Sequence, residues 1–126
     1  MARQEVPAVV RSYRDLVVWQ KSMDLVVAVY QLTRQFPKEE LYALTNQIRR
    51  AAVSIPSNVA EGQARQSTAE FRSFLSIARG SLAEVETQLL IALRLGYLRQ
   101  DQLDWVMPLH DEVSKMIPSL MKSLPR

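Results

Sequence analysis

The sequence predicts an all-α protein, namely an up-down-up-down antiparallel four-helix bundle. Apolar residues recur at helical spacing in four successive segments, and no strand pattern competes with them. The connections near residue 37 and at residues 62–67 and 96–101 are short, and short connections make consecutive helices antiparallel neighbours. At 126 residues, with 48% hydrophobic and 23% charged residues, the chain has the size and composition of one soluble domain.

The first helix is predicted from Asp15 to Pro37. Residues 1–14 show no sustained apolar period, so we expect a flexible N-terminal arm followed by a single helical-bundle domain over residues 15–126. The helix carries two adjacent apolar stripes: Leu16, Trp19, Met23, Val26 and Tyr30 in one, and Val18, Leu25, Val29, Leu32 and Phe36 in the other. This face is wider than one core requires, so the helix is either central in its bundle or buried again between subunits.

The second helix is predicted from Pro37 to Gly62. A proline followed by acidic residues is typical of a helix start, because the acids complement the helix dipole. The inward stripe consists of Leu41, Leu44, Ile48, Ala52, Ile55 and Val59. Pro56 removes a backbone donor within this stripe, so we expect a kink near residues 52–55. Gly62 suits a left-handed residue at the helix end.

The third helix is predicted to begin at Ser67, which has the capping-box spacing to Glu70, and to end at Gly96. Leucines repeat every seven residues along it, at Leu75, Leu82 and Leu89, as in helices that cross at a shallow angle. Three small residues would let a second helix approach closely: Ala78, Gly80 and Ser81.

The fourth helix is predicted to start at Asp101, a good N-cap. Its apolar stripe contains Pro108 and Pro118, so we expect it to be bent or split into shorter pieces.

Catalytic and metal-binding residues are not predicted. The sequence has no cysteine, which excludes disulfides and thiolate chemistry, and its only histidine is His110. A di-iron bundle needs Glu-x-x-His pairs on two helices, whereas the residue three before His110 is Met107. We therefore expect no enzymatic activity, cofactor or metal, and we expect His110 at the solvated edge of the last helix.

A polar stripe on the second helix is the candidate interface. It consists of Arg50, Ser54, Asn58 and Glu61, which share one helix face. Three interpretations remain open. The stripe forms a hydrogen-bonded contact with Ser81 and Glu84, or it lies between subunits with Arg50 paired to a neighbouring carboxylate, or it binds a ligand.

The basic residues give a candidate nucleic-acid surface. The net charge is +3, and twelve of the sixteen cationic residues are arginine. The candidate contacts are Arg49, Arg65, Arg72 and Arg79. The competing interpretation is a solvated face neutralised by nearby glutamates.

A targeting signal and a segment long enough to span a membrane are both missing from the sequence, so we expect a cytoplasmic protein without a membrane partner.

The chain resembles the small bacterial four-helix-bundle family whose genes were first noticed inside intervening sequences of 23S ribosomal RNA. The resemblance covers about residues 13 to 98. It is carried by residues 16–21, by Phe36-Pro37, by residues 47–62 with their Ser54-Ile55-Pro56-Ser57-Asn58-Val59-Ala60-Glu61-Gly62 run, by Phe71 and Phe74-Leu75, and by residues 77–84 and 95–97.

This resemblance implies a bundle that assembles as a closed homo-oligomer, most often a pentamer, with no assigned enzymatic activity. A related branch, the accessory variability proteins of diversity-generating retroelements, binds reverse transcriptase and RNA through a basic surface. Two function classes are therefore expected. The first is a non-enzymatic homo-oligomeric scaffold that contacts itself and an unidentified protein. The alternative is an RNA-associated accessory protein that binds nucleic acid nonspecifically through arginines.

Overall fold

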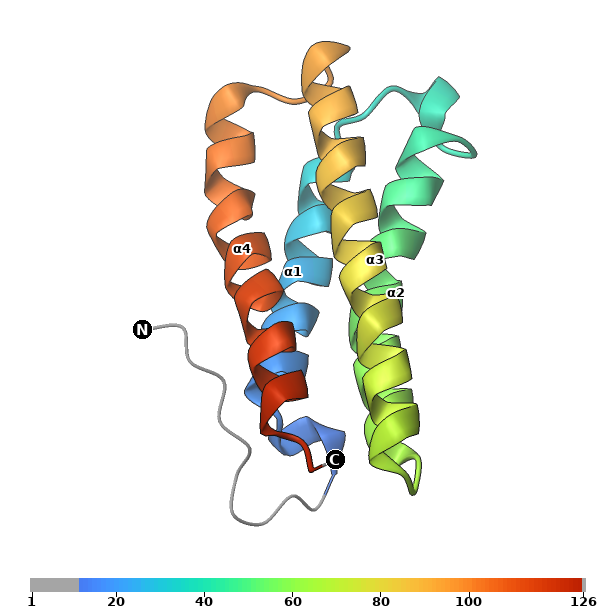
Figure 1. Cartoon of the computed structure of the whole chain (residues 1–126). Helices are drawn as coiled ribbons and strands as arrows, with labels where there is room; N and C mark the ends of the chain where they lie inside the picture. The colour runs from blue at the N-terminus through green and yellow to red at the C-terminus, as the bar shows by residue number, and fades with distance from the viewer. Residues whose placement is uncertain (1–11, 126) are drawn as a thin grey trace.

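A computed structural model describes residues 12–125 of the chain, and within them it contains only helices. The long helices are α1 (Val17–Thr33), α2 (Leu44–Ala64), α3 (Thr68–Arg94) and α4 (Gln100–Ser123), with two short 3-10 helices, η1 (Tyr13–Asp15) and η2 (Lys38–Glu40). The four long helices lie side by side (Figure 1). The prediction of an all-α, four-helix fold is confirmed.

The core lies between the four helices, each of which packs against two neighbours, and α2 and α3 share the most extensive contact. One of the two predicted stripes of α1 is buried throughout, including Val18, Leu25 and Val29. It meets fully buried side chains from the other three helices, such as Ile48, Leu75 and Ile117. Burial of each such side chain contributes about 1.5–3 kcal/mol.

The residues just ahead of α1 form the short helix η1. The Ser12 hydroxyl accepts a hydrogen bond from the Arg14 amide at 3.0 Å, and the Asp15 carboxylate accepts one from the Ser12 amide at 3.3 Å. The ring centroids of Tyr13 and Trp19 are 5.3 Å apart. Of the expected arm, residues 1–11 lie outside the described residues, and residues 12–14 make these local contacts.

The predicted start of α2 at Pro37 is wrong. Residues after Pro37 form the separate helix η2, and α2 begins only at Leu44, after Ala43 departs from helical geometry with φ −124° and ψ −108°. The acidic residues after Pro37 do not lie in the first turn of α2. Glu40 instead precedes the helix, and its Oε1 accepts a hydrogen bond from the Leu44 amide at 3.3 Å. From Leu44 the helix continues through Pro56 to Ala64.

Gly62 also differs from its predicted role. It lies inside α2, and the glycine with positive φ in the described chain is Gly96. The reason for glycine at position 62 is space, since an added Cβ would stand 2.7 Å from Phe74 Cβ and 3.0 Å from Phe71 Cδ1. Close packing of α2 on α3 therefore requires this glycine.

The predicted ends of α3 are confirmed. The Ser67 hydroxyl accepts a hydrogen bond from the Glu70 amide at 3.0 Å, and Gly96 has φ +79° just after the helix. The Tyr97 amide donates to the Ala92 carbonyl, which closes the last turn. The three heptad leucines are buried. Gly80 is exposed with open space beside it, so it does not serve helix approach within this chain.

Helix α4 is a single helix that includes both Pro108 and Pro118. Of the two expected alternatives, a bent helix or shorter pieces, the structure excludes the shorter pieces. The N-cap of α4 is Arg99 rather than Asp101, and the Arg99 amide donates to Gln102 Oε1 at 2.9 Å. Pro108 is exposed, where water can hydrate the carbonyl that a proline leaves unpaired.

Candidate interaction surfaces

One residue of the polar stripe, Ser54, joins α2 to α3, and Asn58 of the stripe supports it from within α2. The hydroxyl groups of Ser54 and Ser81 are 2.8 Å apart. The Asn58 amide group donates to the Ser54 carbonyl at 2.7 Å and to the Ser54 hydroxyl at 2.9 Å. Because Ser81 is buried, this small network gives its polar groups partners at the contact between the two helices.

The other two residues of the stripe face outward. Glu61 pairs with Arg65 at 2.9 Å, one helical turn away and partly exposed. Arg50 is exposed and has no hydrogen bond or ion pair within residues 12–125. It lies beside a hollow of about 270 Å³ between α2 and α3, which Ser54, Ser81 and Glu84 also line. The stripe is thus divided between a helix contact and an open surface.

Three of the four arginines considered for nucleic acid have intramolecular partners. Arg49 Nε donates to Thr33 Oγ1 at 2.8 Å, and its guanidinium lies 4.7 Å from the centroid of the Tyr30 ring. Arg65 contacts Glu61, and it also lies 3.7 Å from a carboxylate oxygen of Glu70. These contacts fix Arg49 against α1 and neutralise Arg65.

Arg72 binds the end of α4. Its guanidinium donates to the carbonyl groups of Met121 at 3.3 Å, Leu124 at 2.8 Å and Pro125 at 3.2 Å. The last carbonyls of a helix lack intrahelical partners and carry partial negative charge. Arg72 therefore caps α4 from the neighbouring helix. Arg79, in contrast, is exposed and has no partner among the described residues.

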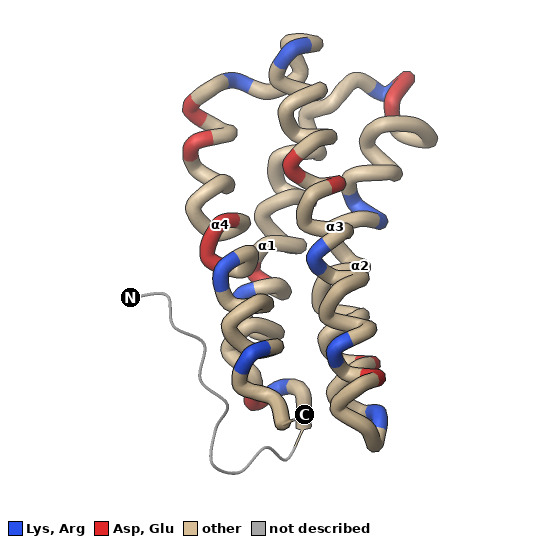
Figure 2. Tube along the Cα trace, viewed as in Figure 1, with Lys and Arg blue, Asp and Glu red and all other residues tan. Residues whose placement is uncertain are grey.

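Charges of both signs occur on every long helix (Figure 2). On α4 the acidic residues Asp101 and Asp104 lie near the N-terminus and Lys122 lies in the last turn. This order complements the helix dipole. The hydrogen bond from Arg99, together with its charge, holds the pKa of the Asp101 carboxyl below its ordinary value.

An apolar surface remains open where α1 meets α2. Met23 is 41% exposed, Val27 56% and Val53 40%. Met23 and Val53 also line a hollow of about 330 Å³, together with Tyr13, Trp19, Val26, Pro56, Ser57 and Ala60. The first predicted stripe of α1 is therefore only partly covered by its own chain, as its excess width indicated. We call this surface the α1–α2 apolar face and define it by Met23, Val27 and Val53 with the lining of the hollow.

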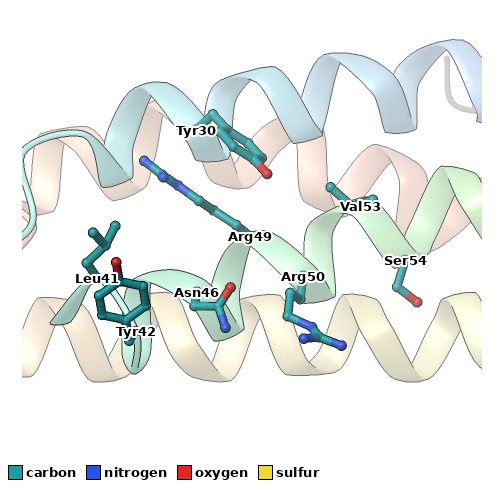
Figure 3. A pocket seen from close by; sticks show the side chains of 8 residues that line it. All are labelled: Tyr30, Leu41, Tyr42, Asn46, Arg49, Arg50, Val53 and Ser54. Atoms are coloured by element: carbon teal, nitrogen blue, oxygen red, sulfur yellow. The ribbon is translucent and has the colours of Figure 1, made fainter.

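A third hollow, of about 600 Å³, continues from this face toward the start of α2. Its lining combines aromatic, basic and amide side chains: Tyr30, Leu41, Tyr42, Asn46, Arg49, Arg50, Val53 and Ser54 (Figure 3). We call it the aromatic–arginine hollow. This hollow is not predicted from the sequence, because Tyr30 and Arg49 come from different helices and Tyr42 lies in a turn. The sequence carries no signal for this arrangement, because the segment around Tyr42 is predicted to be helical, whereas the structure has a turn there.

His110 is buried, not solvated as predicted, with 3% of its surface exposed. Its Nε2 lies 2.8 Å from the Leu82 carbonyl and its Nδ1 lies 3.3 Å from Asp111 Oδ1. A carbonyl only accepts, so Nε2 donates to it, and this bond links α4 to α3. Within residues 12–125 no group of three His, Asp or Glu side chains converges as a metal site requires.

The helices within residues 12–125 are too short or too polar to cross a membrane.

A family model for 23S rRNA-intervening sequence proteins matches residues 14–119. The chain belongs to this family. The match covers all four long helices except the last residues of α4, so the family assignment and the four-helix fold concern the same part of the chain.

A solved structure supports the family assignment. It is the crystal structure of a protein of unknown function from the S23 ribosomal protein family of Bacteroides thetaiotaomicron. The two chains are 27% identical and superpose with a TM-score of 0.76, over 85% of this chain and all of the other. A search of curated proteins finds no match.

Proposed function

We propose that this member of the 23S rRNA-intervening sequence protein family is a non-enzymatic interaction module that assembles with copies of itself into a closed ring, with five copies as the family resemblance implies. Within each copy the helices run up-down-up-down. The short connections at residues 65–67 and 95–99 support this order, and so does the hydrogen bond of 2.8 Å between Tyr97, after α3, and Glu40, before α2.

The observation that carries the proposal is the α1–α2 apolar face. Side chains such as Met23, Val27 and Val53 project into solvent next to an apolar hollow. Contiguous apolar surface of this kind marks interaction sites on proteins. A second copy is the simplest occupant, because every copy brings the same uncovered face and each covered Å² of apolar surface contributes about 25 cal/mol.

Sedimentation velocity of the full chain tests this proposal. We expect a single species several times heavier than the 14.4 kDa protomer. The double variant Met23→Glu, Val53→Glu places charges on the apolar face and is expected to dissociate the assembly. Gln31→Glu, which adds one charge to an exposed position of α1, is the control and is expected to leave the assembly intact. A monodisperse 14.4 kDa wild-type protomer would exclude the proposal.

RNA binding through Arg49, Arg65, Arg72 and Arg79 is the weaker proposal. Three of these arginines already have partners within the chain. Arg49 contacts Thr33, Arg65 contacts Glu61 and Glu70, and Arg72 contacts the end of α4. Only Arg79 of the set has no partner among the described residues. A single exposed arginine per copy gives a weak, strongly salt-dependent attraction even when a ring repeats it. A low-salt filter-binding assay with structured RNA tests this set, and binding that survives Arg79→Gln would exclude it.

A further inference from the structure

The aromatic–arginine hollow has an uncommitted tyrosine at its edge. Tyr42 is 91% exposed and stands in the turn that precedes α2. It makes no aromatic contact and no hydrogen bond within residues 12–125. A tyrosine in this position contributes almost nothing to the core, so its large flat ring is available to a molecule outside the chain.

Two further polar side chains continue from Tyr42 along the outer side of α2. Asn46 and Arg50 are four residues apart on the helix and therefore neighbours on one face. Both are exposed, and neither has a hydrogen-bond partner in the described part of the chain. Figure 3 shows Tyr42, Asn46 and Arg50 following one another along the start of this helix. The row offers a ring, an amide and a guanidinium in that order.

The inner wall of the hollow supplies a fixed positive charge. Arg49 donates to Thr33 Oγ1, which in turn donates to the Val29 carbonyl at 2.8 Å. The ring of Tyr30 covers one side of the Arg49 guanidinium. These contacts hold the charge in place before any ligand arrives, so binding loses little side-chain entropy. The residues that line the hollow include two arginines and no carboxylate.

We propose that the aromatic–arginine hollow binds a nucleobase together with its neighbouring phosphate. The base stacks on Tyr42, the Asn46 amide reads the edge of the base, and Arg50 binds the phosphate, with Arg49 adding positive potential behind it. Stacking on an exposed aromatic ring next to arginine is the common mode of single-strand recognition. This site shares only Arg49 with the Arg49, Arg65, Arg72 and Arg79 set, and it does not depend on the ring assembly.

A protein ligand is the competing class. Tyrosine and arginine are also enriched in protein interfaces, where they fill buried pockets of the partner. The hollow is wide and open, with the tyrosine ring at its edge rather than at the bottom of an apolar pocket. An open cationic surface with a free ring fits a base and a phosphate better than an apolar anchor. Among protein ligands, an acidic peptide is the one that the two arginines would attract.

Fluorescence anisotropy with a labelled single-stranded RNA of about eight nucleotides tests the proposal, since one such strand spans a typical single-strand site. Tyr42→Ala is expected to raise Kd about tenfold or more through lost stacking, whereas Tyr42→Phe keeps the ring and the affinity. Arg50→Gln is expected to weaken binding and to reduce the slope of log K against log salt by about 0.7. Arg94→Gln removes the same charge from an exposed position of α3 that belongs to neither candidate site, and it is the matched control.

Competition with adenosine monophosphate distinguishes the two sources of the ligand. If adenosine monophosphate displaces the RNA at a concentration near the Kd of the mononucleotide, the ligand of the hollow is a free nucleotide. If the RNA stays bound at that concentration, the ligand is a nucleic-acid strand. Three results would overturn the site. These are no binding of either ligand, equal affinities of wild type, Tyr42→Ala and Arg50→Gln, or displacement of the RNA by an acidic peptide. Sedimentation that shows a changed assembly for Tyr42→Ala would overturn it as well, because Tyr42 would then lie between copies.

Discussion

Gly62 of α2 lies so close to Phe74 of α3 that a methyl group at position 62 would stand 2.7 Å from the Phe74 Cβ. A Cβ atom moves only with its backbone, so the clash is not relieved by rotating the phenyl ring. The same end of the interface holds Phe71, whose Cδ1 would lie 3.0 Å from the added group. The distance between the two helices is therefore set by the absence of a side chain at Gly62.

Gly62→Ala is expected to destabilise the protein by about 1–3 kcal/mol, the usual range for overpacking a tight contact. Gly80→Ala is the matched control, because it lies within α3 with no atom within 4 Å of its added Cβ. In an exposed helix interior the alanine is expected to stabilise by about 0.5–1 kcal/mol. Urea unfolding followed by circular dichroism measures both. Equal effects of the two substitutions would show that the Phe74 contact does not set the helix spacing.

Arg72→Gln is expected to loosen the end of α4. The arginine donates to the carbonyls of Met121, Leu124 and Pro125, and of these the Met121 carbonyl also accepts from the Leu124 amide. Losing a charged cap of this kind costs about 1–2 kcal/mol. Hydrogen exchange should show faster exchange of amides in the last turn of α4, while the first turns keep their protection.

The control for this prediction is Arg79→Gln, one helical heptad further along α3. Arg79 is exposed and has no partner in residues 12–125, so its loss should change neither the exchange pattern nor the unfolding free energy by more than about 0.5 kcal/mol. If Arg72→Gln behaved like this control, the carbonyl contacts would contribute nothing to stability.

The period of the apolar residues was sufficient to predict four helices and much of the core. Leu25, Leu75, Leu82 and Leu89 are buried as predicted, because a helix has one inward face and the sequence repeats along it. A helix end can also be predicted when the residues that form its cap are close in the sequence. At the start of α3 the Ser67 hydroxyl accepts from the Glu70 amide, only three residues away.

The errors occur where one residue type serves several physical purposes. Glycine at position 62 satisfied a helix-end signal, but its actual reason is Phe74 on another helix. Arg72 fitted a basic surface, whereas it caps a helix that is distant in the sequence. The aromatic–arginine hollow forms only when α1 and the turn before α2 come together. None of these relationships is periodic, so a reading of the chain alone has no signal for them.

Tyr97→Phe removes the phenol hydroxyl that connects the α3–α4 connection to the α1–α2 connection. Tyr97 Oη donates to Glu40 Oε2 at 2.8 Å, and its ring lies 5.7 Å from that of Phe36. The hydrogen bond to Glu40, with partial burial and the charges of Glu40 and Glu39, raises the pKa of the phenol above its ordinary value of 10.0. The folded state therefore favours the neutral phenol.

The sign of the pH dependence follows from this shift. The stabilisation by Tyr97 is fully present below about pH 10, where the phenol is neutral in both states, and is lost as the pH rises through the higher pKa of the folded protein. Wild type should exceed Tyr97→Phe in stability at neutral pH, and the difference should disappear in strong base. Tyrosine absorbance titration gives the pKa directly, with Tyr42→Phe as the exposed control. A difference that stays constant with pH would contradict the Glu40 contact.

His110→Ala tests whether the buried histidine serves structure or chemistry. The ring is buried between α4 and α3, and Nε2 donates to the Leu82 carbonyl of α3 at 2.8 Å. Removing the ring leaves a cavity and a lost hydrogen bond, which together cost about 2–4 kcal/mol. Nε2 already donates to the Leu82 carbonyl, and within residues 12–125 no group of three His, Asp or Glu side chains converges on a metal site, so we expect no zinc binding at His110. Thermal unfolding of the wild type should therefore give the same Tm with added Zn²⁺ and with a chelator. A Tm that rises with Zn²⁺ in the wild type but not in His110→Ala would show that the histidine is a metal ligand instead.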